Sequence, residues 1–241
     1  MKTTSKHAGR PMVVVLTGAG VSAESGIKTF RDNNGLWEEY NVMDVATPEA
    51  WRANPELVTR FYNLRRVQLG TVKPNPAHLA LAELEKHFPL QIITQNVDDL
   101  HERAGSSQVM HLHGELTKMR STVYPNDVYE VGYREMEADA RCSKGTVLRP
   151  HIVWFGEEVP LISDAVEWVS KADILLVIGT SLNVYPAAGL LHYAPRRSEK
   201  YLIDPGDHNP EGIPGLVFIQ EPAGLAMPLL AEKLIRKYAD D

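Results

Sequence analysis

The feature that most constrains the fold of this chain is a series of six short runs of apolar and β-branched residues. Longer segments with helical character separate these runs. The runs occupy residues 12–16, 90–94, 109–112, 174–178, 201–203 and 216–219. Three of them are almost continuously apolar, as is typical of strands that helices cover on both faces of a parallel sheet. Helices are expected over 55–69, 77–87, 161–171 and 222–238. The alternation predicts an α/β fold with a doubly wound, Rossmann-like parallel sheet.

Composition narrows the class of protein. The chain has 241 residues, with 25 Lys and Arg against 31 Asp and Glu, and its net charge of −6 argues against a dominant nucleic-acid surface. Its single cysteine, Cys142, excludes an internal disulfide and any multi-cysteine zinc cluster. No run is long enough to span a membrane, and no apolar stretch near the start predicts a signal peptide. We therefore expect a soluble, cytoplasmic protein.

Two segments do not follow the alternation. Residues 118–148 are polar and lack a clear strand-helix pattern, which predicts a small insert outside the main sheet. Residues 29–48 are similarly irregular and are expected to form a long functional loop.

Small or polar residues follow nearly every predicted strand. They are Gly18, Ala19 and Gly20, then Gln95, Asn96 and Asp98, then His113, then Gly179, Thr180 and Ser181, and finally Asp204. In an open parallel sheet, ligands bind beyond the carboxyl ends of the strands. The sequence therefore predicts a ligand crevice at this edge.

The turn after the first strand carries a glycine pattern. Residues 18–23, GAGVSA, match the G-x-G-x-x-G/A fingerprint that lets a backbone approach a pyrophosphate, although a purely structural turn explains it equally well. The terminal acid that a hydride-transfer dehydrogenase shows after its second strand is missing. The loop instead offers Arg31 for a phosphate and Phe30 for a nicotinamide or ribose. The alternative is that Phe30 and Trp37 only anchor the loop.

Two further groups each have two interpretations. Gln95, Asn96 and Asp98 either hold sugar hydroxyls and a carboxamide or form a helix-capping Asx turn. His111 and His113 share a strand face. They form either part of a metal site with Glu115 or, in the case of His113, a general base.

The remaining candidates concern a substrate. Tyr62 and Arg65 share one helix face and either clamp a carboxylate or form a solvated surface pair. Residues 151–157, HIVWFGE, form either a buried strand or an edge that accepts a peptide by strand addition.

Five ordered segments resemble the sirtuins, the NAD-dependent protein lysine deacylases. They are GAGVSAESGIKTFR (18–31), TQNVDDLHERAG (94–105), HLHGEL (111–116), RPHIVWFGE (149–157) and GTSLNVYPAA (179–188). Ala23 together with Tyr62-x-x-Arg65 resembles the class III branch, whose tyrosine and arginine recognise the carboxylate of succinyl- or malonyl-lysine. Bacterial members of that class also remove acetyl groups.

The resemblance implies a role for each matching residue. His113 matches the general base, and Asn96 is the second catalytic residue. The implied NAD-binding residues are Gly18, Ala19, Gly20, Ala23, Phe30, Arg31, Trp37, Gln95, Asn96, Asp98, Gly179, Thr180, Ser181, Asp204 and Ala223. The implied residues for the acylated lysine are Tyr62, Arg65, Val153, Phe155, Gly156 and Val184.

The implied activity is removal of acetyl and succinyl or malonyl groups from lysine side chains, with release of nicotinamide and O-acyl-ADP-ribose. A protein ADP-ribosyltransferase with the same NAD pocket is the alternative enzyme, and a non-enzymatic binding module is the other class. The expected NAD-binding domain comprises residues 10–30, 75–117 and 149–241, and the expected small domain comprises 31–74 and 118–148.

Two departures from the family stand out. Four cysteines usually bind structural zinc in the small domain, but Ser121 falls near the first expected cysteine and only Cys142 remains, so no metal is expected. An apolar cluster of Val123, Tyr124, Tyr129, Val131, Tyr133 and Met136 is expected instead. The second departure is Asp204, where many relatives carry Asn for the adenosine ribose.

Overall fold

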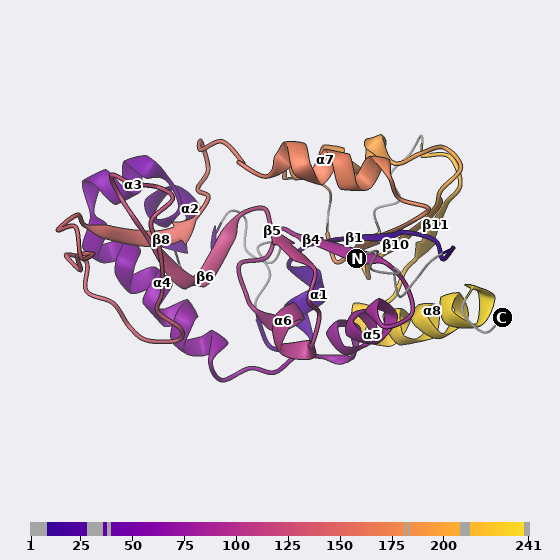
Figure 1. Ribbon diagram of the computed structural model, residues 1–241. Helices are drawn as coiled ribbons and strands as arrows, with labels where there is room; N and C mark the ends of the chain where they lie inside the picture. Colours follow the sequence, from indigo (N-terminus) through magenta and orange to yellow (C-terminus); the bar gives the residue numbers. More distant parts are fainter. Residues whose placement is uncertain are drawn as a thin grey trace, which may run out of the picture.

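A six-stranded parallel sheet forms the centre of the larger part of the molecule (Figure 1). The computed structural model describes residues 9–27, 36–37, 40–180, 182, 184–207 and 213–238. The strand order is β11-β10-β9-β1-β4-β5. The strands are β1 (Val13–Thr17), β4 (Leu90–Thr94), β5 (Val109–His111), β9 (Ile174–Ile178), β10 (Glu199–Ile203) and β11 (Leu216–Ile219). All six predicted runs are in the sheet, so the predicted fold class is confirmed.

Helices cover both faces of this sheet because alternate residues of each strand point to opposite sides. On one face, Val13 and Val15 pack with α5 (Pro76–Glu85) and α8 (Ala223–Tyr238). On the other, Val14 and Leu16 pack with α7 (Ile162–Ser170) and the 3-10 helix η2 (Ala187–Tyr193). Figure 1 shows α7 above the sheet and α5 and α8 below it. The four predicted helices are present; η2 was not expected.

The carboxyl ends of the central strands stop at one level. Thr17, the last residue of β1, pairs with Thr94 of β4 and Ile178 of β9. The chain continues from β1 to β4 on one side and returns through β9 on the other, so the strand order reverses beside β1. Such a reversal opens a crevice in which ligands of parallel sheets bind.

In its described residues, the smaller part contains three helices and an antiparallel sheet. The helices are α2 (Val42–Val45), α3 (Pro48–Ala53) and α4 (Pro55–Leu69), and the sheet has the order β7-β6-β8. Its strands are β6 (Gly114–Ser121), β7 (Val128–Glu130) and β8 (Leu148–Ile152). Residues 118–148 therefore lie outside the main sheet, as predicted. The segment predicted as an irregular loop over 29–48 contains α2 and the strand pair β2 (Leu36–Trp37) and β3 (Tyr40–Asn41).

The apolar cluster expected within 118–148 is partly wrong. The cluster in the structure consists of Met119, Val131, Cys142 and Leu148. Of the expected members, Val131 is buried in it, and Tyr129 and Met136 are partly buried against it. Val123, Tyr124 and Tyr133 are exposed. The last two make polar contacts instead: the Lys144 ammonium lies 4.8 Å from the ring centre of Tyr124, and the Tyr133 hydroxyl donates to Asp99.

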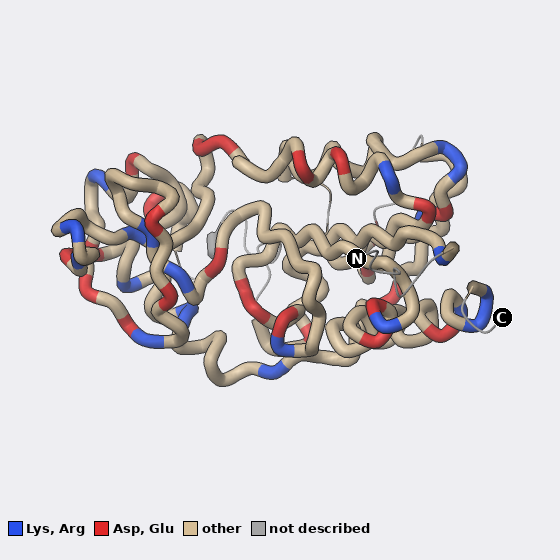
Figure 2. Tube along the Cα trace, viewed as in Figure 1, with Lys and Arg blue, Asp and Glu red and all other residues tan. Residues whose placement is uncertain are grey.

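Charged residues lie mainly at the periphery, and the central strands carry almost none (Figure 2). Within the described ranges, no helix has both the length and the apolar character required to cross a membrane.

Candidate functional site

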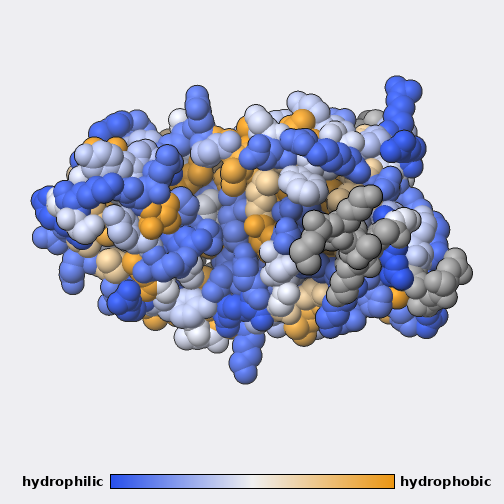
Figure 3. All heavy atoms as spheres, in the orientation of Figure 1, coloured by the Kyte–Doolittle hydropathy of each residue, from blue (hydrophilic) through white to orange (hydrophobic). Residues whose placement is uncertain are grey.

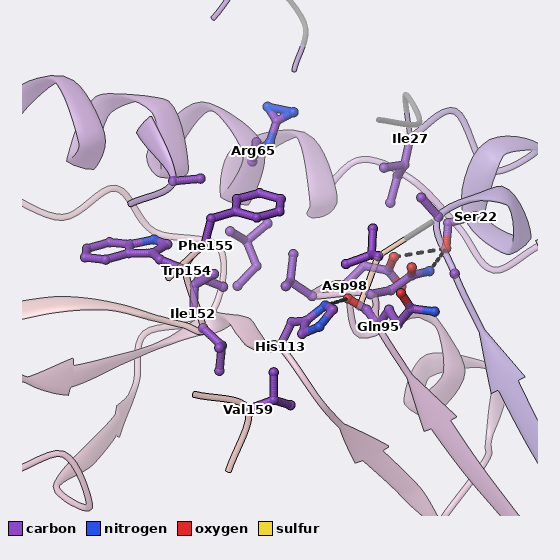
Figure 4. Close-up of a pocket in the computed structure, with 18 of the residues that line it drawn as sticks. Ser22, Ile27, Arg65, Gln95, Asp98, His113, Ile152, Trp154, Phe155 and Val159 are labelled. Atoms are coloured by element: carbon purple, nitrogen blue, oxygen red, sulfur yellow. Dashed lines mark hydrogen bonds between the residues drawn. The ribbon is translucent and has the colours of Figure 1, made fainter. Parts of the chain in front are cut away.

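A cavity of about 290 Å³ lies between the carboxyl ends of the main strands and the smaller part. Figure 3 shows the surface hollowed between the two parts, with apolar residues gathered along the hollow. In Figure 4, Ser22, Gln95 and Asp98 lie to one side of His113, and Trp154, Phe155 and Arg65 lie to the other. We call these the polar end and the aromatic end of the cavity.

A chain of hydrogen bonds fixes the polar end. The Asn96 side-chain nitrogen donates to Ser22 Oγ (3.1 Å), and Ser22 Oγ donates to Asp98 Oδ2 (2.9 Å). The other Asp98 oxygen accepts from the backbone nitrogen of Leu100 (3.2 Å), at the start of α6 (Leu100–Ala104). Asp98 therefore caps the turn before α6 with one carboxylate oxygen and contacts Ser22 in the cavity wall with the other. Burial raises the pKa of Asp98.

A buried layer of hydroxyls and imidazoles lies beneath the polar end. Thr17 Oγ1 donates to Thr94 Oγ1 (2.8 Å) and lies 3.1 Å from His101 Nε2. The ring of His101 lies 4.9 Å from that of His78, whose Nε2 is 3.4 Å from Ser22 Oγ. Burial lowers the pKa of His78 to about 4 and, with the adjacent His78 ring, holds the pKa of His101 well below its ordinary value. Both imidazoles are therefore neutral at pH 7.

His113 lies between the two ends and has one nitrogen committed to the backbone. Its Nδ1 is 3.0 Å from the carbonyl oxygen of Gln95, which can only accept, so Nδ1 carries the proton and Nε2 is basic. Burial lowers the pKa of His113, which keeps the ring neutral at pH 7. Gly114 follows with φ +82° and lies so close to His151 that a Cβ there would be 2.0 Å from its carbonyl oxygen.

His111 is engaged elsewhere. Its Nδ1 lies 3.1 Å from the Asn96 carbonyl oxygen, and its Nε2 lies 2.8 Å from the Glu102 carboxylate. Burial is the largest single effect and opposes its charged form, but the hydrogen bond to Glu102 together with the negative charges of Glu102 and Glu115 raises the pKa of His111. Glu115 is paired with Lys118 (2.6 Å). Among the residues that the structure describes, no three His, Cys, Asp or Glu side chains come together in a way that could hold a metal ion.

The glycines of two strand-end turns lie against each other. A Cβ on Gly18 would be 2.8 Å from the Gly179 carbonyl oxygen, and one on Gly20 would be 2.7 Å from Gly179 Cα. Gly179 itself has φ +63°, where side chains are strained. The close approach of the two turns is therefore enough to explain why positions 18, 20 and 179 are glycine.

Tyr62 and Arg65 are buried, with 0% and 7% of their surface exposed, so the interpretation as a solvated surface pair is wrong. The Arg65 guanidinium lies 4.3 Å from the ring centre of Phe61. The Tyr62 hydroxyl accepts a hydrogen bond from Trp154 Nε1 (3.0 Å). Long-range packing of α4 against the segment after β8 buries this helix face.

Residues 153–156 leave β8 and enter the cavity wall. The backbone nitrogen of Val153 donates to the His113 carbonyl oxygen (2.9 Å), and that of Phe155 donates to Ala46 (3.0 Å). Phe155 is 45% exposed, so this segment is not a fully buried strand.

The structure brings most of the predicted site residues to one cavity. Those that line it are Gly18, Ala19, Tyr62, Arg65, Gln95, Asn96, Asp98, His113, Val153, Phe155, Gly156, Gly179, Thr180 and Val184. Phe30, Arg31 and Ser181, and the side chain of Trp37, lie outside the described residues.

Four predicted residues do not line the cavity, namely Gly20, Ala23, Asp204 and Ala223. Gly20 backs onto Gly179, and Asp204 is fully buried with Oδ1 accepting from Gly206 (2.9 Å). Ala223 is buried at the start of α8, where the Glu24 carboxylate accepts from Gly224 (2.6 Å).

Several lining residues were missed, notably Ser22, Ile27, Gln68, Trp154 and Glu157. Ser22 lies within the glycine pattern, and Trp154 and Glu157 lie within the quoted 149–157 segment. Sequence spacing identified these segments but not which of their side chains reach the cavity.

Comparisons with known proteins show which family this chain belongs to. The Sir2 family model matches residues 18–186. An NAD-dependent protein deacylase of Bacteroides thetaiotaomicron is 61% identical over 198 residues, which are 80% of this chain and 85% of that protein. One of Helicobacter pylori is 53% identical over 223 residues, 92% of this chain and 97% of that protein. The crystal structure of a Sir2 homologue in complex with NAD superposes on this chain with a TM-score of 0.86 and 41% sequence identity. The superposition covers 95% of this chain and 91% of the homologue. The chain therefore belongs to the Sir2 family, the sirtuins.

Proposed function

We propose that this chain is an NAD-dependent protein lysine deacylase that removes acetyl groups and the acidic succinyl and malonyl groups. The observation that carries the proposal is the position of His113, with its basic Nε2 in a cavity that is polar on one side and aromatic on the other. The names of the Bacteroides and Helicobacter relatives and the NAD complex of the structural neighbour support the NAD-dependent deacylase activity.

The polar end fits the ribose and carboxamide of NAD. Asn96 and Asp98 present fixed amide and carboxylate groups, and Ala19 and Thr180 come from the two touching turns. When bound, NAD supplies the ribose carbon that an acyl oxygen attacks as nicotinamide leaves. His113 Nε2 then accepts the proton of a ribose hydroxyl. Desolvation, which lowers its pKa, keeps this nitrogen unprotonated at neutral pH.

The aromatic end fits an acyl chain that ends in a carboxylate. Tyr62 offers a phenol and Arg65 a guanidinium, and both belong to the cavity wall. Such a pair recognises a carboxylate through charge and two kinds of hydrogen bond. Val153, Gly156 and Val184 are proposed to bind the backbone of the acylated peptide.

We also propose that residues 118–148 fold without structural zinc, and that they form the small domain together with residues 31–74. Ser121 Oγ accepts from the backbone nitrogens of Val123 (3.1 Å) and Tyr124 (3.0 Å) and lies 2.7 Å from Thr146 Oγ1. Cys142 Sγ lies 3.0 Å from the same threonine. These hydroxyl contacts connect the turn that follows Ser121 with the turn at residues 142–146, in place of a metal ion. Elemental analysis of purified protein tests this, and stoichiometric zinc would contradict it.

Mass spectrometry of an acetylated and a succinylated peptide, each with and without NAD, tests the activity. We expect unmodified lysine peptide and O-acyl-ADP-ribose only with NAD. ADP-ribose attached to protein, without loss of the acyl group, would instead establish the ADP-ribosyltransferase alternative.

A further inference from the structure

The indole of Trp154 makes a contact that the proposed reaction leaves unexplained. Trp154 is 2% exposed, and its Nε1 donates to the hydroxyl oxygen of Tyr62 at 3.0 Å. An indole N–H can only donate, so the Tyr62 oxygen is the acceptor. The hydroxyl proton of Tyr62 must therefore point away from the indole, and within the described part of the chain it is donated to no protein acceptor.

A pair of charged groups fixes the orientation of Trp154. The Glu157 carboxylate accepts from the backbone nitrogen of Trp154 (2.8 Å) and from both terminal nitrogens of Arg149 (2.6 and 3.0 Å). The Arg149 guanidinium in turn stacks on the Trp154 indole, 3.3 Å from the ring centre. Arg120 approaches the same carboxylate at 3.3 Å. Backbone and ring are thus held by one ion-pair network, which leaves the indole little freedom to rotate.

We propose that Trp154 is a specificity-determining positioning residue, which holds the Tyr62 hydroxyl so that its proton is presented to the carboxylate of an acidic acyl-lysine beside Arg65. The inference rests on the proposed deacylase function and deepens its substrate class. Burial, the largest effect on Tyr62, raises the pKa of this phenol, so that it remains a donor at neutral pH. Trp154 acts through Tyr62 and has no part in the deacetylation chemistry at His113.

Substitution of Trp154→Phe tests the hydrogen bond while it keeps an aromatic ring for Arg149 to stack on. One neutral hydrogen bond corresponds to roughly a 3- to 10-fold change. We expect the ratio of kcat/KM for a succinyl-lysine peptide to that for an acetyl-lysine peptide to fall by about this factor, through a higher KM for the succinylated peptide. Trp51→Phe is the matched control, because the ring centre of Trp51 lies 5.9 Å from that of Trp154 and Trp51 is not part of the cavity wall. It should leave the ratio unchanged.

A double-mutant cycle shows whether the effect passes through Tyr62. In a Tyr62→Phe background, Trp154→Phe should cause no further fall in the ratio. A fall of the same size in both backgrounds would overturn the inference, as would equal losses on the two peptides, which indicate a structural role alone. Thermal unfolding of each variant verifies that it folds.

The same measurements separate failure of this inference from failure of the function. A wild-type protein that hydrolyses acetyl-lysine but not succinyl-lysine contradicts the acidic substrate class and this inference with it. A wild-type protein active on neither peptide contradicts the deacylase proposal. If the wild-type protein acts on both peptides and Trp154→Phe leaves the ratio of kcat/KM values unchanged, only this inference is contradicted.

Discussion

The two ends of the cavity are assembled in different ways. The polar end consists of Gln95, Asn96 and Asp98 directly after β4, joined to Ser22 after β1. The aromatic end joins Tyr62 of α4 to Trp154 after β8, which are 92 residues apart in sequence. Strand pairing alone therefore brings the polar groups together, whereas the aromatic groups meet only once the smaller part has packed.

This difference links substrate choice to the packing of the smaller part. Tyr62 and Trp154 belong to one buried cluster with Phe61, Leu116 and Ile152. A change in that cluster is expected to alter which acyl group is accepted. The polar end depends on hydrogen bonds, so changes there are expected to affect all substrates alike.

The largest effect is expected at His113, which lies between the ends. His113→Ala removes the basic nitrogen and should lower the deacylation rate by roughly 10²- to 10⁴-fold on acetyl- and succinyl-lysine peptides alike. Release of free lysine peptide measures this. A variant that loses only one of the two activities would show that the ends do not share a reaction centre.

The next largest effect is a loss of folding stability at low pH, which we expect to arise from His78 beneath the polar end. His78 has a folded-state pKa of about 4 against an ordinary value of 6.5, so its unfolded form binds the proton more readily. Its contribution to stability is complete above pH 6.5 and is lost as the pH falls towards 4. The loss amounts to about 3 kcal/mol.

Denaturant unfolding at pH 7 and pH 4 measures this contribution. The decrease in unfolding free energy should be smaller in His78→Gln than in wild type by about that amount. An identical decrease in the two proteins would mean that the imidazole is already charged in the folded state.

A charge substitution at each end should separate their roles. Arg65→Met should lower kcat/KM on succinyl-lysine by roughly 10- to 150-fold relative to acetyl-lysine, because a hydrogen bond to a charged group is lost. Equal losses on the two peptides would refute the carboxylate clamp.

The matched change at the polar end is Asp98→Asn, which keeps an acceptor for Ser22 but removes the charge. It should lower kcat/KM for NAD by a similar factor with either peptide. Steady-state kinetics with NAD as the varied substrate measure this, and a loss confined to one peptide would contradict the division into two ends.

The smallest effect is on pH dependence. Because burial lowers the pKa of His113, its neutral form persists below the ordinary value of 6.5. The acid limb of log kcat/KM should therefore have its midpoint below pH 6.5, with activity lost as the pH falls through it. A midpoint above 6.5 would indicate that a nearby negative charge, rather than desolvation, dominates at this histidine.

Local patterns predicted the main sheet and the polar end. All six apolar runs are strands, and α4 begins as expected, with Asn54 capping it by accepting from Leu57 and with Pro55 as its first residue. The strands, the helix cap and the polar residues that directly follow each strand depend on neighbours in the sequence, whereas the contacts of Ser22 with Asn96 and Asp98 join segments more than 70 residues apart. The burial of Tyr62 and Arg65 was not predictable in this way, since it depends on β8 and the segment after it. The exposure of Val123 and Tyr124 follows likewise from tertiary packing, since hydrophobic residues in a turn cannot all reach a small core.

The close fit of Gly18 and Gly20 against Gly179 has a mechanical consequence. The backbone nitrogen of Gly20 donates to the carbonyl oxygen of Gly179 (2.8 Å), so the turn after β1 cannot move towards the turn after β9 unless that turn moves as well. We therefore expect a displacement of Ala19 in that direction to displace Thr180 too.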